Sequence, residues 1–154
     1  MINGPSELGR RLLEASQRGE PSTVRALLRD GVSPDARWSE QGITALMVAI
    51  DATTVQALVS AGADVNAQDD FGRTALMWQA RRGDLTVLES LLDAGADRGL
   101  RDAEGRLARD YASSVSHDRV LRWRGKLTQF VWFHRWRNGA ILDLLDPEHG
   151  AGSK

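Results

Sequence analysis

The stretch DDFGRTALMWQARRGDLTVLESLLDAGAD (69–97) can be aligned with SEQGITALMVAIDATTVQALVSAGAD (39–64), which precedes it in the chain. Both contain a glycine, then Thr-Ala-Leu-Met, two apolar runs and Gly-Ala-Asp, in the same order. The same frame continues at DAEGRLARDYASSVSHDRVLRW (102–123), and RRLLEASQRGEPSTVRALLRDGVSPDA (10–36) fits a further copy without its leading turn. An internal repeat at a fixed period predicts a solenoid.

Each copy has the sequence features of two helices joined by a turn. Thr44 and Thr74 precede apolar runs, at positions where a threonine hydroxyl can accept hydrogen bonds from the first amides of a helix. Leu76 and Ala80 recur at helical spacing, and Gly95 follows the second run, where a left-handed backbone ends a helix at low cost. A single helix pair cannot bury its own apolar face, so the copies are expected to stack.

The repeated residues resemble ankyrin repeats. The family motif of Thr-Pro-Leu-His-x-Ala-Ala, a Gly-His turn, a Val/Leu-rich second helix and Gly-Ala-Asp-Val-Asn-Ala is matched closely by 39–68 and 69–101 and less well by 10–37 and 102–124. The resemblance implies an all-α fold, an ankyrin-repeat solenoid of stacked helix-turn-helix units with short β-turn tips. We place the array at 1–124, with repeats near 6–38, 39–68, 69–101 and 102–124.

Two departures from the family motif bear on the fold. Met47 and Met77 replace the usual histidine, which removes a side chain that forms hydrogen bonds between neighbouring repeats. The second repeat is also three residues shorter than the third, in the segment IDATTV (50–55) where a Gly-His turn is expected. At about 1.5 Å of rise per residue, the inner helix or its turn loses roughly 4–5 Å, which predicts a notch in the middle of the array.

The C-terminal part of the chain is basic and aromatic. Residues 119–142 carry six basic side chains and no acid, although the whole chain has a net charge of −1. Segment 125–146 is expected to cap the solenoid, because an array end needs a helix with an apolar inner face and a polar outer face. Trp132, Phe133 and Trp136 do not fit on one such face and form a candidate secondary binding surface. Residues 147–154 are predicted to be a disordered tail.

No sequence pattern points to catalysis, a cofactor or a metal site. The chain has no cysteine, and we interpret its three histidines, His117, His134 and His149, as structural or tail residues. We interpret the acidic residues Asp64, Asp69, Asp97 and Asp102 as turn formers rather than as ligands. We therefore expect a protein that is not an enzyme.

The sequence also indicates where the protein is located in the cell. No secretory signal and no membrane-spanning stretch is recognisable, which favours the cytoplasm. Only two of the twenty basic residues are lysine, which suggests a GC-rich, bacterial coding sequence.

The resemblance implies a module that binds another protein through its turn tips and the concave face of its inner helices. Exposed aromatic and arginine side chains dominate many protein interfaces, and several arginines here indicate a partner that is acidic at the contact. We expect a monomer without a nucleic-acid partner, because the small basic patch on an acidic body offers little counterion release. The candidate partner-binding residues are Arg37, Trp38, Glu40, Gln41, Asp51, Asp70, Phe71, Arg73, Arg81, Arg82, Arg101 and Glu104.

Two alternatives stay open at this point. A small free-standing array is also suited to an inhibitor or immunity-type protein that occludes a cognate enzyme or toxin. The basic aromatic segment 125–146 also suits a peripheral membrane or assembly factor, although a membrane role is the least favoured of the three.

Overall fold

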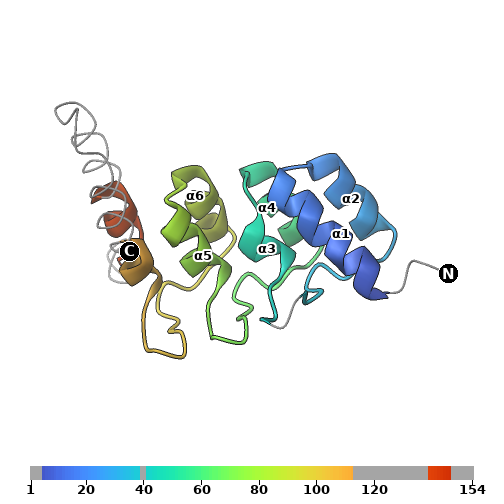
Figure 1. Ribbon diagram of the computed structural model, residues 1–154. Helices are drawn as coiled ribbons and strands as arrows, with labels where there is room; N and C mark the ends of the chain where they lie inside the picture. The colour runs from blue at the N-terminus through green and yellow to red at the C-terminus, as the bar shows by residue number, and fades with distance from the viewer. Residues whose placement is uncertain (1–4, 39–40, 113–138, 147–154) are drawn as a thin grey trace, which may run out of the picture.

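The computed structural model describes residues 5–38, 41–112 and 139–146. Helix pairs are stacked side by side in a single row, with the turns that join successive pairs along one edge (Figure 1). Among these residues no extended strand forms, and only two isolated β-bridges join Trp38 to Ile43 and Gln68 to Thr74. The predicted all-α solenoid is confirmed.

The helices form two layers. The inner layer holds α1 (Pro5–Arg18), α3 (Ala45–Val48) and α5 (Ala75–Arg82), and the outer layer holds α2 (Pro21–Arg29), α4 (Ala52–Ser60) and α6 (Leu85–Asp93). Each inner helix packs on the next inner helix, and each outer helix on the next outer helix.

Local sequence explains where the helices begin and end. The Thr74 hydroxyl accepts a hydrogen bond from the Met77 amide at 3.4 Å, and Thr44 occupies the equivalent N-cap position of α3. Asp84 caps α6 by accepting from the amides of Thr86 and Val87. Gly62 and Gly95 follow the outer helices with φ angles of 88° and 91°, in the left-handed region where only glycine is unstrained.

The hydrophobic core runs along the seam between the two layers. Its largest buried side chains come from both layers and from every helix pair, which makes the array one continuous unit. Met47 and Met77, which replace the family's histidine, are 0% and 1% exposed. The thioether side chains therefore fill apolar space at positions that would otherwise carry a polar ring.

The second repeat is shortened as the sequence predicts. Its inner helix α3 has 4 residues, whereas α5 has 8. The difference of four residues corresponds to about 6 Å of helix, somewhat more than the 4–5 Å expected from the sequence. Residues 45–49 are nevertheless buried, so the shortening does not open the core to solvent.

A glutamine from the neighbouring repeat closes the end of the short helix. Gln79, on α5, is fully buried, and its Nε2 donates to the carbonyls of Met47 at 3.0 Å and Ala49 at 2.8 Å. These carbonyls have lost the helical turn that would have supplied their partners. The Gln79 Oε1 is buried without a hydrogen-bond partner.

The C-terminal end of the described array is covered by a short helix at 139–144. Ile141 and Leu145 are each 1% exposed and belong to the core, and Arg98 Nε donates to the Leu144 carbonyl at 2.8 Å. The capping role of segment 125–146 and the domain boundaries stay predictions, because most of that segment lies outside the described residues. Glu40, His117, Trp132, Phe133 and Trp136 lie outside the described residues, as do His134, His149 and the tail 147–154.

Candidate protein-binding surface

The turn tips of successive repeats are joined to one another by backbone hydrogen bonds. The Asp70 amide donates to the Gln41 carbonyl at 3.0 Å, and the Ala103 amide donates to the Phe71 carbonyl at 2.9 Å. The Gln68 side chain adds a bond to the Arg101 carbonyl at 3.1 Å. The three tips thus form a linked row in which the backbone of each tip is bound to the next.

A buried aspartate organises the tip of the third repeat. The Asp69 side chain has no exposed surface, and its carboxylate accepts from the amides of Phe71 and Arg73 at 3.0 and 2.8 Å. The same carboxylate accepts from Arg73 Nε at 2.7 Å and from Trp78 Nε1 at 3.1 Å. Four donors to one carboxylate offset the cost of burying its charge.

Arg73 differs from the sequence-based expectation. Its side chain is only 18% exposed, and its guanidinium lies 4.8 Å from the centre of the Phe71 ring and 4.7 Å from the Trp78 ring. The sequence suggested a freely exposed cation, but the ion pair with Asp69 and the two ring faces hold the side chain within the turn. The Arg73 charge therefore stabilises the fold of the tip and is not available to a partner.

The fourth tip repeats this arrangement with a tyrosine. Arg106 Nε donates to Asp102 at 2.8 Å and its guanidinium lies 4.9 Å from the Tyr111 ring, while the Tyr111 hydroxyl donates to Asp102 at 2.5 Å. Burial by itself would raise the pKa of Asp102, but hydrogen bonds from Tyr111, Arg106 and the Glu104 amide lower it to about 2. Burial and the bond to Asp102 raise the pKa of Tyr111 to about 12.

Most charges on the tips are paired within the chain. Arg37 Nη1 lies 3.5 Å from Asp70 Oδ1, and Arg106 Nη1 lies 3.0 Å from Glu104 Oε2. Arg101 is exposed, and its Nη1 donates to the Gly105 carbonyl at 2.7 Å. Of the described tip charges named here, Arg37, Asp70, Glu104 and Arg106 are in ion pairs, and Arg101 is bound to a backbone carbonyl.

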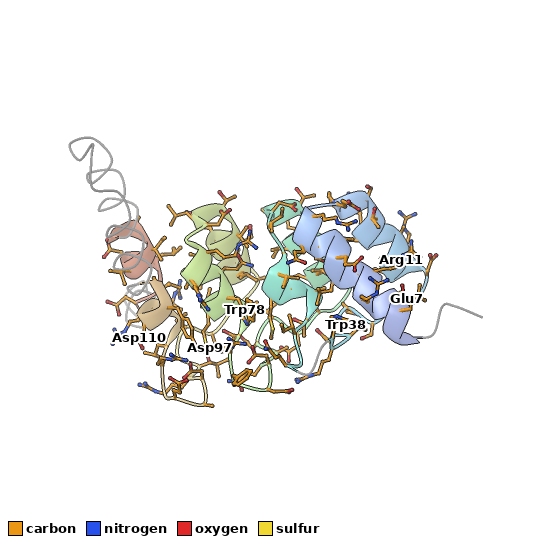
Figure 2. All side chains as sticks on the ribbon, viewed as in Figure 1. Glu7, Arg11, Trp38, Trp78, Asp97 and Asp110 are labelled. Carbon is orange, nitrogen blue, oxygen red and sulfur yellow. The ribbon has the colours of Figure 1, made fainter. Side chains whose placement is uncertain are left out.

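The aromatic candidates on the tips differ in exposure. Phe71 is 51% exposed, which agrees with the expectation from sequence. Trp38 is half-buried rather than exposed, because its backbone pairs with Ile43 at 2.9 and 3.0 Å and holds the residue against the turn. Figure 2 places Trp38 and Trp78 where the turns meet the helices.

The inner helices carry arginines at their C-terminal ends that form no ion pair with any other residue the structure describes. Arg81 and Arg82 are exposed at the end of α5, as the sequence predicts, and Arg18 is exposed at the end of α1. Asp51, another predicted binding residue, is half-buried, and its carboxylate accepts from the amide and hydroxyl of Thr54 at 2.8 and 2.7 Å. Asp51 thus caps α4.

Comparison with known families agrees with this geometry. Residues 58–112 match the family described as ankyrin repeats (many copies), and residues 41–70 match the family described as ankyrin repeat. The chain is an ankyrin repeat protein. A comparison with curated proteins returned no match. Ankyrin repeats generally mediate protein–protein interaction and are typically not catalytic.

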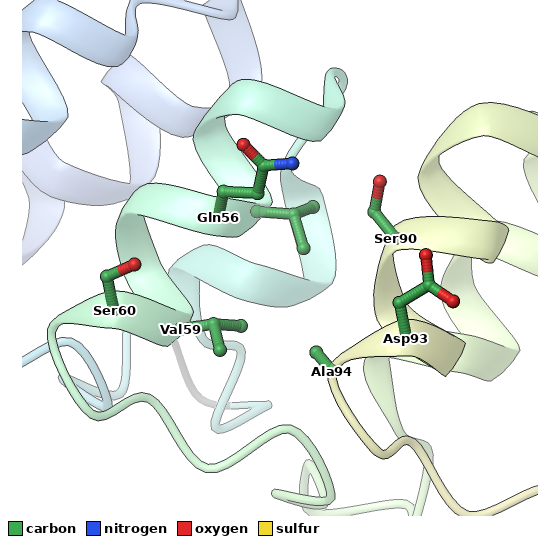
Figure 3. A pocket seen from close by; sticks show the side chains of 7 residues that line it. Gln56, Val59, Ser60, Ser90, Asp93 and Ala94 are labelled. Carbon is green, nitrogen blue, oxygen red and sulfur yellow. The ribbon is translucent and has the colours of Figure 1, made fainter.

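The ankyrin array also has a shallow hollow on its outer layer. It measures about 230 Å³ and lies between α4 and α6, with Val55, Val59 and Ala94 beside the polar side chains of Gln56, Ser60, Ser90 and Asp93 (Figure 3). It brings together no set of charged groups. We therefore assign the candidate surface of the array to the tips and the inner-helix ends.

The described residues also bear on metal clusters, membrane-spanning helices and turn-forming aspartates. Within residues 5–38, 41–112 and 139–146, no three potential metal-ligating side chains gather in one place. None of the helices in these same ranges has the length and apolar character needed to cross a membrane. The predicted turn role of the aspartates is confirmed, since Asp64 and Asp97 each accept from an amide two residues ahead, as Asp69 and Asp102 do.

Sequence reasoning missed the aspartate–arginine–aromatic sets of the ankyrin array. Asp69, Arg73 and Trp78 recur 33 residues later as Asp102, Arg106 and Tyr111, so the spacing was available in the sequence. The second repeat has Ile43 and Val48 at the positions of Arg73 and Trp78, which breaks the pattern. A pattern present in only two of three copies does not stand out from the ordinary polarity of turns.

Proposed function

We propose that the chain is a non-enzymatic module that binds another protein through the linked turn tips and the C-terminal ends of its inner helices. The observation that carries this proposal is Phe71, an aromatic side chain with half of its surface in solvent and a rigid setting. Its amide is bound by Asp69, its carbonyl accepts from Ala103, and its ring covers the Arg73 guanidinium.

Rigidity makes this exposed ring suited to recognition. An aromatic side chain that is already ordered in the free protein loses little conformational entropy when a partner covers it. Aromatic residues at the centre of an interface also contribute a large share of the binding energy in many complexes. A partner with an apolar contact for Phe71 is the best fit to this tip.

The partner's preferred charge is set by the helix ends. Tip charges are largely neutralised by Arg37–Asp70 and by the contacts of Arg106, whereas Arg81 and Arg82 form no ion pair among the described residues. An acidic contact surface on the partner follows from this difference. We place the protein in a bacterial cytoplasm as a monomer, in keeping with its composition.

The test is affinity capture from cytoplasmic extract with four baits. They are the unmodified chain, Phe71→Ala, the pair Arg81→Glu with Arg82→Glu, and the matched control pair Arg25→Glu with Arg29→Glu on the exposed side of α2. The control makes the same change in net charge on the outer layer. Circular dichroism checks that each bait is folded.

We expect one stoichiometric partner with the unmodified chain and the control pair, and a reduced yield with the other two baits. The complex would then be reconstituted from purified components, and light scattering would give its stoichiometry and the state of the free chain. If the partner is an enzyme that loses activity on binding, the protein is an inhibitor. If all four baits retain the same partner equally, these residues do not form the binding surface and the proposal fails.

A further inference from the structure

The shortened second repeat lacks the last helical turn that would stand between two arginine groups at the ends of the inner helices, and we call this missing turn the gap. Arg18 and Arg82 occupy equivalent positions, each the last residue of an inner helix and each followed by a glycine, Gly19 and Gly83, with φ angles of 66° and 74°. Between them α3 stops at Val48, four residues earlier in its own repeat than α5 does. No helical residue of the second repeat therefore stands between the two arginines.

The spacing of these two groups follows from helix packing. α1 packs on α3, and α3 packs on α5, so Arg18 and Arg82 are two helix spacings apart (Figure 1). Neighbouring packed helices lie about 8–10 Å apart, which puts the two helix ends about 16–20 Å apart. Arg81, next to Arg82, adds a second charge at the α5 end.

All three arginines are available to a ligand. Arg18, Arg81 and Arg82 are exposed, and none forms an ion pair among the described residues. Each also lies at a helix C-terminus, where a cation is favourably placed beside the unpaired carbonyls. They contrast with Arg73 and Arg106, whose charges are held by buried aspartates.

Ile50 and Asp51 follow α3 in the second repeat, between the first and third repeats of the row, and lie against the turn next to Arg18. A Cβ atom at Gly19 would lie 3.0 Å from Ile50 Cδ1 and 3.1 Å from Asp51 Oδ2, so both side chains sit against this turn. Ile50 is half-buried, and Asp51 already caps α4. A ligand that runs from Arg18 to Arg82 passes the Ile50 side chain and the Asp51 carboxylate, which favours an apolar residue and disfavours an acidic one between its two acidic ends.

We propose that Arg18 on one side and Arg81 with Arg82 on the other bind an extended acidic segment of a partner protein, with acidic residues at both ends and an apolar residue between them. The proposal rests on the proposed function and specifies the ligand of the inner-helix ends. At about 3.3 Å per residue, an extended chain spans about 16–20 Å in five or six residues. The two acidic groups should thus be separated by four or five residues.

A peptide fits this surface better than a nucleic acid does. The chain has a net charge of −1, and the site offers three arginines that form no ion pair among the described residues, so binding would release few counterions. Guanidinium groups bind carboxylates through paired N–H donors, which gives directional contacts at both ends of the gap. A peptide can also place an apolar side chain between its acidic residues, in contact with the half-buried Ile50.

The test uses fluorescein-labelled synthetic peptides and the full chain, with binding measured by fluorescence anisotropy at low salt. The first peptide has two glutamate pairs separated by Gly-Leu-Ser-Gly, and the second has the same composition with its four glutamates contiguous. A double-stranded DNA oligonucleotide is the third probe. The protein variants are Arg18→Glu, Arg82→Glu and the outer-layer control pair Arg25→Glu with Arg29→Glu.

We expect the spaced peptide to bind more tightly than the contiguous one and its affinity to fall as salt is added. Arg18→Glu and Arg82→Glu should each weaken binding by about tenfold, while the control pair leaves it within about twofold. Equal binding of the two peptides, equal losses in the control pair, tighter binding of the DNA or no binding at all would each overturn the inference. If the peptides fail but Phe71→Ala still removes a captured partner, the proposed function stands without this site.

Discussion

Replacing Gln79 with leucine tests how the array tolerates its short inner helix. Leucine has about the same side-chain volume as glutamine, so it fills the same fully buried position. It cannot donate the two hydrogen bonds to the Met47 and Ala49 carbonyls, at 3.0 and 2.8 Å. Both acceptors lie in residues that are 0% exposed, so water does not replace the lost donor. Each buried unpaired carbonyl costs about 1–3 kcal/mol, or about 4 kcal/mol for the two.

The substitution also has a stabilising effect that offsets part of this loss in the free energy of unfolding. The Gln79 Oε1 is already buried without a partner, and its removal relieves a penalty of about 2 kcal/mol. The net destabilisation is therefore about 2 kcal/mol. With a urea m-value of about 2 kcal/mol/M, the unfolding midpoint should fall by about 1 M.

Urea unfolding followed by circular dichroism measures this change. The matched control is Gln56→Leu, the same substitution at an exposed helical position of α4, which should shift the free energy of unfolding by less than about 0.5 kcal/mol. If Gln79→Leu is as stable as the unmodified chain, the carbonyls of the short helix do not depend on Gln79. Gln79 would then have no part in closing the end of α3.

Three further expectations concern the turns and the C-terminal cap. The pKa of Asp102 is about 2 in the folded chain, below its ordinary value of 3.8, so its stabilising effect should be present above about pH 4 and lost as the pH falls toward 2. Tyr111→Phe should lower stability by about 1.5–3 kcal/mol at neutral pH and weaken this pH dependence in urea unfolding between pH 2 and 6; an unchanged profile would contradict the assignment. Arg73→Ala should lower stability by about 1–3 kcal/mol and Arg82→Ala by less than about 0.5 kcal/mol, and equal effects in thermal unfolding would count against the structural role of Arg73. Ile141→Ala should cost about 2–4 kcal/mol because its side chain is 1% exposed within the core, and a negligible shift of the urea midpoint would show that this helix does not cap the array.

The repeat architecture was accessible from the sequence because its signals are local. The N-cap threonines, the glycines after the outer helices and the leucines at helical spacing each act within a few residues of the chain. Their recurrence in one register predicted the stacked helix pairs. The shortened second repeat was visible for the same reason, as three residues missing between two fixed points, Thr44 and Gly62.

The state of individual side chains was harder to predict, because it depends on what packs beside them. Arg73 and Arg82 both belong to the third repeat, yet Arg73 lies between two rings on a buried carboxylate, whereas Arg82 is exposed and forms no ion pair within 5–38, 41–112 and 139–146. Asp51 is a polar residue near the concave end whose carboxylate is occupied by Thr54. Sequence spacing places such residues on the right surface without saying which charges are free.

By itself, then, the sequence determined the all-α repeat architecture, the position of the short repeat and the turn-forming role of the aspartates. These depend on backbone preferences and on apolar periodicity, which neighbouring residues encode. Only the tertiary structure decided that Gln79 closes the short helix and that Arg98 binds the cap through the Leu144 carbonyl, across a sequence separation of 46 residues. Such contacts exist only after the repeats have stacked, because stacking brings a donor from one unit against an acceptor that another unit has left open.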